Sequence, residues 1–149
     1  MIRARHVAAG LAAALAVAAS TAWTANGMRR FVWENRPLVV IAPGPDHPDL
    51  RRQQRIAESH RAGFRDRDMV VIAITEGEVT VDREPAPDLD AASLRERFEV
   101  PPAAFRALLV GKDGTVKLRA ERPISAERLF ERIDAMPMRQ REMREDSRG

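Results

Sequence analysis

The chain of 149 residues contains no cysteine and no tyrosine, and its aromatic residues are five phenylalanines and two tryptophans. Without cysteine it can form neither a disulfide nor a thiolate, which excludes thiol oxidoreductases and thiol peroxidases. The scarcity of aromatic rings leaves little to stack on the bases of a single-stranded nucleic acid. The fold must therefore be held together by packing alone.

The chain opens with the three-part pattern of a secretory signal peptide. Arg3 and Arg5 make a basic start, residues 7–19 form an apolar, alanine-rich run, and small residues follow at Ser20 and Ala22. We expect cleavage after Ala22. The alternative is that the segment is kept as a membrane anchor, although its apolar run is shorter than the roughly 20 residues that span a bilayer. The sequence predicts a periplasmic or secreted protein with no stable membrane insertion after cleavage.

Removing the 22 residues of the signal peptide from 149 leaves 127, enough for one domain with its own core. Arg3 and Arg5 leave with the signal peptide, so the formal charge falls from +3 to +1. A nearly neutral chain gives no reason to expect nucleic acid as a partner. We divide the remainder into a lead-in over residues 23–35, a domain over residues 36–138 and a polar, solvated tail over residues 139–149.

Two apolar runs joined by a helix open the domain. Leu38 to Ala42 and Met69 to Ile74 are continuous and rich in β-branched residues, which is typical of strands buried on both faces. Between them, Asp46 or His47 can cap a helix whose apolar stripe runs from Leu50 to Phe64. One helix between two buried strands predicts a right-handed parallel βαβ unit.

The second half predicts a helix, a hairpin and a final helix. After a polar loop with a possible short strand at Val79 to Val81, the two helices begin at the capping residues Asp90 and Ser125. We expect Pro137 to end the final helix. The stretch "ALLVGKDGTVKLR" predicts a β-hairpin around Asp113-Gly114. Its apolar side chains are expected to face the final helix: Leu108, Val110, Val116 and Leu118.

This order of elements is the thioredoxin plan, an α/β three-layer sandwich. A central mixed sheet, built from a βαβ half and an αββα half, is flanked by helices. The segments "RPLVVIAP", "LRERFEVP", "LVGKDGTVKLR" and "IDAMPMRQREM" resemble the bacterial domain-of-unknown-function 4174 family over roughly residues 31 to 143. The resemblance implies a thioredoxin-like or peroxiredoxin-like fold, related to domains in some animal extracellular matrix proteins. It implies no established activity and no agreed catalytic residues.

A comparison with thioredoxins shows what the junction of first strand and first helix lacks. In those enzymes the N-terminus of the helix lowers the pKa of a cysteine placed there. Here Asp46, His47 and Asp49 occupy the junction, and a carboxylate would turn an activating site into a cap. Aligning "LLVGKDG" with the thioredoxin hairpin puts Arg106 where thioredoxins carry a cis-proline. Peroxiredoxins have an arginine near this place, but there it assists a cysteine.

The same junction supplies Asp46 and His47 as candidate site residues, and the start of the third strand, across the expected cleft, supplies Arg106. If they converge in one cleft, they could bind an anion or hydrolyse an anionic substrate. The alternative is that these three residues only cap the helix and contact solvent. His60, on the apolar stripe of the first helix, is expected to be partly buried and hydrogen-bonded rather than a ligand.

Methionines near the C-terminus offer a second candidate site. Met136, Met138 and Met143 form an M-x-M-x4-M pattern, and thioether sulfurs select cuprous copper. The alternative is that Met136 packs in the core and the others lie in a flexible tail.

We therefore predict an exported, noncatalytic thioredoxin-like module, binding or structural, without thiol redox activity. Its partner is an unknown protein or small molecule, with no nucleic acid, no cofactor and no metal site expected. The cleft hydrolase and periplasmic copper binding remain as alternatives.

Overall fold

The computed structural model describes residues 27–149 as a six-stranded sheet with helices on both faces. The predicted signal peptide and its cleavage point after Ala22 lie outside the described residues. The strand order is β4-β3-β2-β1-β5-β6. Over the described range, no helix combines the length and the apolar character needed to cross a bilayer.

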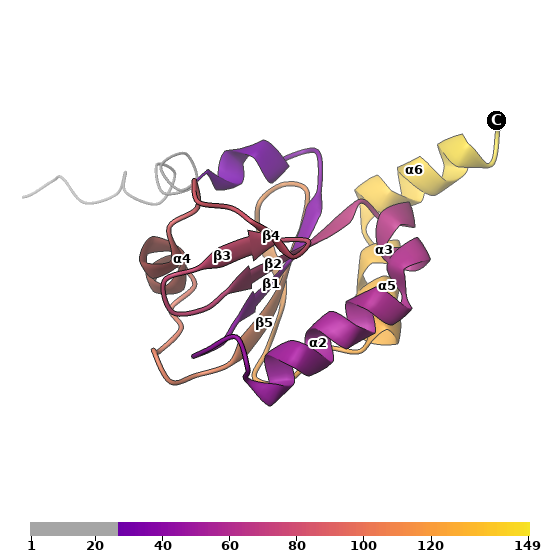
Figure 1. The fold of residues 1–149 in the computed structure, drawn as a ribbon. Coiled ribbons are helices and arrows are strands. Elements are labelled where there is room, and N and C mark those ends of the chain that lie inside the picture. Colours follow the sequence, from indigo (N-terminus) through magenta and orange to yellow (C-terminus); the bar gives the residue numbers. More distant parts are fainter. Residues whose placement is uncertain (1–26) are drawn as a thin grey trace, which may run out of the picture.

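Strands β1 (Arg36–Ile41) and β2 (Met69–Ile74) form the parallel centre of this sheet. Every residue of β1 is buried, because elements cover both faces of the sheet. Helices α2 (Pro48–Ser59) and α3 (Arg61–Asp66) connect the two strands and lie on one face (Figure 1). The predicted βαβ unit is confirmed, but the helix breaks at His60, which is exposed rather than partly buried.

A short hairpin extends the sheet beyond β2. Strand β3 (Val79–Val81) pairs antiparallel with β2, and β4 (Glu84–Pro85) forms the outer edge. The two residues between these strands, Asp82 and Arg83, have φ angles of 48° and 72°. Positive φ at both positions is the geometry that closes a two-residue hairpin with the twist of the strands.

The second half of the chain adds antiparallel strands and covers the other face. As predicted, Asp90 caps helix α4 (Ala91–Arg97) by accepting the N–H of Ser93 at 2.8 Å. Ser125 caps helix α5 (Ala126–Asp134) by accepting the N–H of Arg128 at 3.2 Å. In Figure 1, α4 lies across the sheet from α2 and α5. The remaining elements are η1 (Met28–Phe31), β5 (Arg106–Val110), β6 (Val116–Ala120) and α6 (Pro137–Asp146).

The β5–β6 hairpin is confirmed, but two of its details differ from the prediction. The Gly111 N–H donates to the Thr115 carbonyl at 2.8 Å, so the connection spans residues 111–115 rather than two residues alone. Leu108 and Val110 pack with η1 and α4, on the face opposite to the final helices. Leu109 and Leu118 face α5 instead, and Val116 is 45% exposed.

The two faces of the sheet carry separate apolar clusters. The first cluster packs η1 and α4 against side chains that include Ile41, Ile72 and Ile74. The second packs α2, α3 and α5 against alternate residues of the same strands, including Val40 and Ala73. Strand alternation thus uses both sides of β1 and β2 and gives the predicted three-layer sandwich.

The C-terminal segment differs from the predicted solvated tail. Helix α5 ends at Asp134, before Pro137 as predicted, but Pro137 then starts a further helix, α6, where the missing N–H of proline is harmless. Arg139, in the segment expected to be solvated, is only 4% exposed. The last helix is therefore part of the domain.

Candidate functional site

The candidate site lies at the edge of the sheet where β1 ends. The chain leaves Ile41 through a loop that contains Pro43 and Pro45 and enters α2 with Pro48 as its first residue. In the neighbouring strand, Arg106 pairs with Ile41. This pairing brings the start of β5 beside the end of β1, as the sequence comparison with thioredoxins predicts.

His47 packs at this edge instead of capping the helix through its side chain. It is the N-terminal flanking residue of α2, yet it makes no side-chain capping hydrogen bond. Its ring stacks on the ring of Phe105, with the centroids 5.7 Å apart and the planes inclined by 8°. Its Nδ1 atom is buried without a hydrogen-bond partner among residues 27–149. The expectation that Asp46 or His47 caps α2 through a side chain is therefore wrong.

Asp46 and Arg106 have other partners. The Asp46 carboxylate pairs with Arg51, one turn further along, and is 84% exposed. Arg106 donates from Nη1 to the Phe105 carbonyl at 2.7 Å, and its Nη2 lies 3.3 Å from Oε1 of Glu121. Within the part of the chain that the structure describes, no hydrogen bond joins any two of Asp46, His47 and Arg106. The geometry offers no relay between an acid and a base.

Arg95 is a residue of this edge that the sequence analysis missed. From α4 its Nη2 donates to the Ala42 carbonyl at 3.1 Å, and its Nη1 donates to the Pro102 carbonyl at 3.2 Å. The guanidinium thereby joins the loop after β1 to the loop before β5. No local pattern announces this role, because Arg95 lies 53 residues from Ala42 in the sequence.

At the opposite end of β1, Arg36 is a buried cation in the first position of the strand. Its side chain is 1% exposed, and its Nη1 and Nη2 donate to the two carboxylate oxygens of Glu142 at 3.2 and 3.1 Å. Lys112 joins them, with its Nζ 2.8 Å from Oε1 of Glu142 and 2.8 Å from Oδ2 of Asp68. Burial raises the pKa of Glu142, but Arg36 and Lys112 outweigh it and hold that pKa below its usual value.

A second set of ion pairs continues from there. Arg67 donates from Nε and Nη2 to Asp134 at 2.9 and 2.7 Å and stacks over Phe130. Arg139 reaches Asp66 at 2.6 Å and Asp134 at 3.3 Å. We call the whole set the charge cluster: Arg36, Asp66, Arg67, Asp68, Lys112, Asp134, Arg139 and Glu142. It ties α6 to β1 and α3, and it leaves no cation or carboxylate of the set unpaired.

The methionine pattern is divided between core and surface. Met136 is 8% exposed and belongs to the apolar cluster that packs under α5, as the core-packing alternative to copper binding predicts. Met138 and Met143 lie on α6 and are half-buried. Among residues 27–149, no group of three or more histidine, aspartate or glutamate side chains could hold a metal ion.

Comparison with known proteins supports the fold and gives no activity. Residues 27–142 match the family described as "Domain of unknown function (DUF4174)". The chain is 28% identical over 135 residues to coiled-coil domain-containing protein 80 of Danio rerio, in an alignment that covers 79% of this chain. It spans only about 16% of the length of that relative.

A solved peroxiredoxin, Prx1a of Plasmodium yoelii, has a similar structure. The TM-score is 0.53 at 13% sequence identity, and the superposition covers 75% of this chain and 79% of that one. At this identity the likeness shows the fold alone. It agrees with the thioredoxin-like sandwich expected from the order of the elements.

Proposed function

The chain belongs to the DUF4174 family, and from that premise we propose that it acts as an exported, noncatalytic thioredoxin-like module that binds a partner. The observation that supports this proposal is that packing and ion-pair contacts occupy the sheet edge where thioredoxin-like enzymes hold their thiol. There, His47 stacks on Phe105, and Arg106 pairs with Glu121. Arg95 holds the surrounding loops.

The two arginines at this edge, Arg95 and Arg106, thus bind neighbouring loop and strand-end groups, and the His47 ring packs on Phe105. Because the chain has no cysteine, no side chain can replace the missing thiolate. Fold alone does not imply function, and a thioredoxin-like sandwich without its thiol is free to serve as a binding scaffold.

Activity measurements on the purified chain from residue 23 onward test the noncatalytic part. We expect insulin reduction and peroxide consumption to proceed at the rate of the protein-free control. Turnover of either substrate without added thiol would overturn the proposal.

Export is tested separately with the full chain. When it is expressed with its own N-terminus in a Gram-negative host, we expect it in the osmotic-shock fraction with Trp23 as its first residue. Recovery of uncleaved chain in the membrane fraction would favour the retained anchor. Recovery in the cytoplasm would remove export from the proposal.

Binding is tested by pull-down of the tagged chain from a periplasmic extract. One partner recovered in stoichiometric amount supports the binding role. Repeating the pull-down with Arg106→Gln tests whether that partner binds the sheet edge where β1 ends. This variant removes the guanidinium that pairs with Glu121.

A further inference from the structure

A groove separate from the thioredoxin-like edge lies between the helices and the β3–β4 hairpin. Its volume is about 510 Å³, within the range of roughly 300 to 1,000 Å³ typical of small-molecule sites. One wall combines Ala57 of α2 with Phe64 of α3, which lie on either side of the helix break at His60. The floor is the sheet surface of β2 and β3.

Apolar side chains and polar groups contribute in similar measure to the lining of the groove. Ala57 and Ala73 both border the space, together with Met69, Val71 and Thr80. Ala57, Val71 and Thr80 remain half-buried, so apolar surface is left open to solvent at this point. An apolar chain laid in the groove would cover it.

Charged residues gather on the rim, and most of the carboxylates already have partners. Arg61 pairs with Glu58, and the Asp82 carboxylate accepts the Val71 N–H at 2.8 Å. Glu84 also borders the groove. Its cross-strand partner Val81 packs against the opposite face of the sheet, and side chains of cross-strand partners point to the same face. The Glu84 side chain therefore points away from the groove.

Two rim cations remain without a partner. Arg65 and Arg83 both border the groove and are exposed, and neither guanidinium makes a hydrogen bond or ion pair with any residue of the described range 27–149. Arg65 precedes β2 by one turn, and Arg83 lies in the turn beside the first residues of β2. Both cations therefore border the same end of the groove.

We propose that this groove binds an amphipathic anion, an apolar chain with a carboxylate head. The chain would lie between Ala57 and Ala73, and the head would accept hydrogen bonds from Arg65 and Arg83, which are stronger when both groups are charged. The inference rests on the proposed binding role and gives it a ligand class.

Decanoate is a suitable probe, with decanol as its uncharged counterpart. Calorimetric titration of the chain from residue 23 onward should show decanoate binding more tightly than decanol. The amide resonances of Ala57, Val71, Ala73 and Thr80 should shift on titration. Absence of binding, or equal affinity for the two probes, would overturn the proposal.

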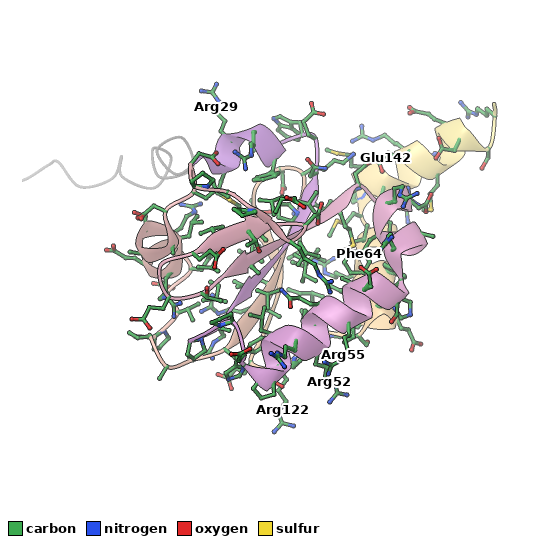
Figure 2. All side chains as sticks on the ribbon, in the orientation of Figure 1. Arg29, Arg52, Arg55, Phe64, Arg122 and Glu142 are labelled. Atoms are coloured by element: carbon green, nitrogen blue, oxygen red, sulfur yellow. The ribbon has the colours of Figure 1, made fainter. Side chains whose placement is uncertain are left out.

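Two substitutions test the anionic head without threatening the fold. Arg83→Gly removes a guanidinium at a φ of 72°, which suits glycine better than arginine, and Arg65→Gln changes an exposed helical residue. Each should weaken decanoate about tenfold, the equivalent of one charged hydrogen bond, and leave decanol unchanged. Arg55→Gln is the matched control, because Arg55 projects away from the groove in Figure 2 and does not border it.

A third substitution tests where the alkyl chain of the ligand binds. Ala57→Leu fills the groove and should abolish binding of both probes, whereas Ala62→Leu, on the exposed side of α3, should not affect it. Thermal melting of all variants establishes that they remain folded. If Ala57→Leu bound decanoate with unchanged affinity, decanoate would bind elsewhere and the groove proposal would be wrong. The noncatalytic role is tested separately, by the insulin and peroxide measurements.

Discussion

At the scale of single residues, Glu142 supplies the countercharge for a guanidinium that is only 1% exposed. Removing one partner of a fully buried ion pair costs roughly 3 to 5 kcal/mol. Because the Glu142 side chain is 24% exposed, we expect Glu142→Gln to lower the free energy of unfolding by less, about 2 to 3 kcal/mol. Urea denaturation measures this loss.

Glu145 provides the matched control on the same helix. It is exposed and makes no ion pair within the described chain, so Glu145→Gln should change stability by less than about 0.5 kcal/mol. Equal urea midpoints for the two variants would show that the Arg36–Glu142 pair contributes nothing.

Gly114 permits the turn of the β5–β6 hairpin, since its φ is 79° and its N–H donates to the Gly111 carbonyl at 3.0 Å. A β-branched residue is strained at such an angle, so Gly114→Val should destabilise the protein by about 1 to 3 kcal/mol. Asp46→Ala serves as the contrast. Its carboxylate forms only an exposed pair with Arg51, and we expect a loss below about 1 kcal/mol. A Gly114→Val variant as stable as the parent would show that the turn tolerates a side chain.

Residues were predictable where their partners are close in the sequence. The side chains of Asp90 and Ser125 each accept the N–H of the residue three positions later, so these helix caps can be recognised from the local sequence. Asp46 carries the same signal but pairs with Arg51 instead. Arg36 gave no signal at all, because Glu142 lies 106 residues away.

At the scale of elements, Gln53 connects α2 to the start of α5. Its side chain is fully buried, donates to the Ile124 carbonyl at 2.9 Å and accepts the Ile124 N–H at 2.7 Å. Gln53→Leu leaves both backbone groups unpaired, and each such group costs about 1 to 3 kcal/mol. We expect a total loss of about 2 to 4 kcal/mol in a urea titration.

The neighbouring Gln54 is half-buried and makes no hydrogen bond through its side chain within the described residues, which makes Gln54→Leu a suitable control. Its stability should stay within about 0.5 kcal/mol of the parent. If Gln53→Leu behaved in the same way, the link between α2 and α5 would be of no energetic importance.

The elements that the sequence predicted are those with a period or a turn of their own. The buried strands and the capped helices belong to this group. Helix α6 does not belong to this group, because most of its residues are charged or polar and show no apolar stripe. It is held by ion pairs with distant segments. The two residues of β4 are too few to show alternation. For β5, the pattern showed that alternate residues share a face but not which helices that face would meet.

At the scale of the whole molecule, the charge cluster makes stability depend on pH. Burial raises the pKa values of Asp134 and Glu142, but their cationic partners outweigh it, so both pKa values lie below the usual range. The folded state therefore binds these protons more weakly than the unfolded state. The resulting stability is complete above the unfolded pKa of about 4 and is lost as the pH falls through the folded pKa values.

We accordingly expect the free energy of unfolding to be level between about pH 7 and pH 5.5 and to fall steadily below about pH 4. Urea titrations at several pH values measure it. In Glu142→Gln the fall should be shallower, because one carboxyl group whose pKa is lowered in the folded state is gone. Identical slopes for the variant and the parent would show that other groups govern acid unfolding.

The charge cluster also bears on when the domain can form. Arg36 and Glu142 lie 106 residues apart in the sequence, so their ion pair can form only after all the residues between them, and the first part of α6, have been synthesised. Until then, the central strand carries a cation with no countercharge to accompany it into the interior. This separation favours late burial of β1, after α6 has been made.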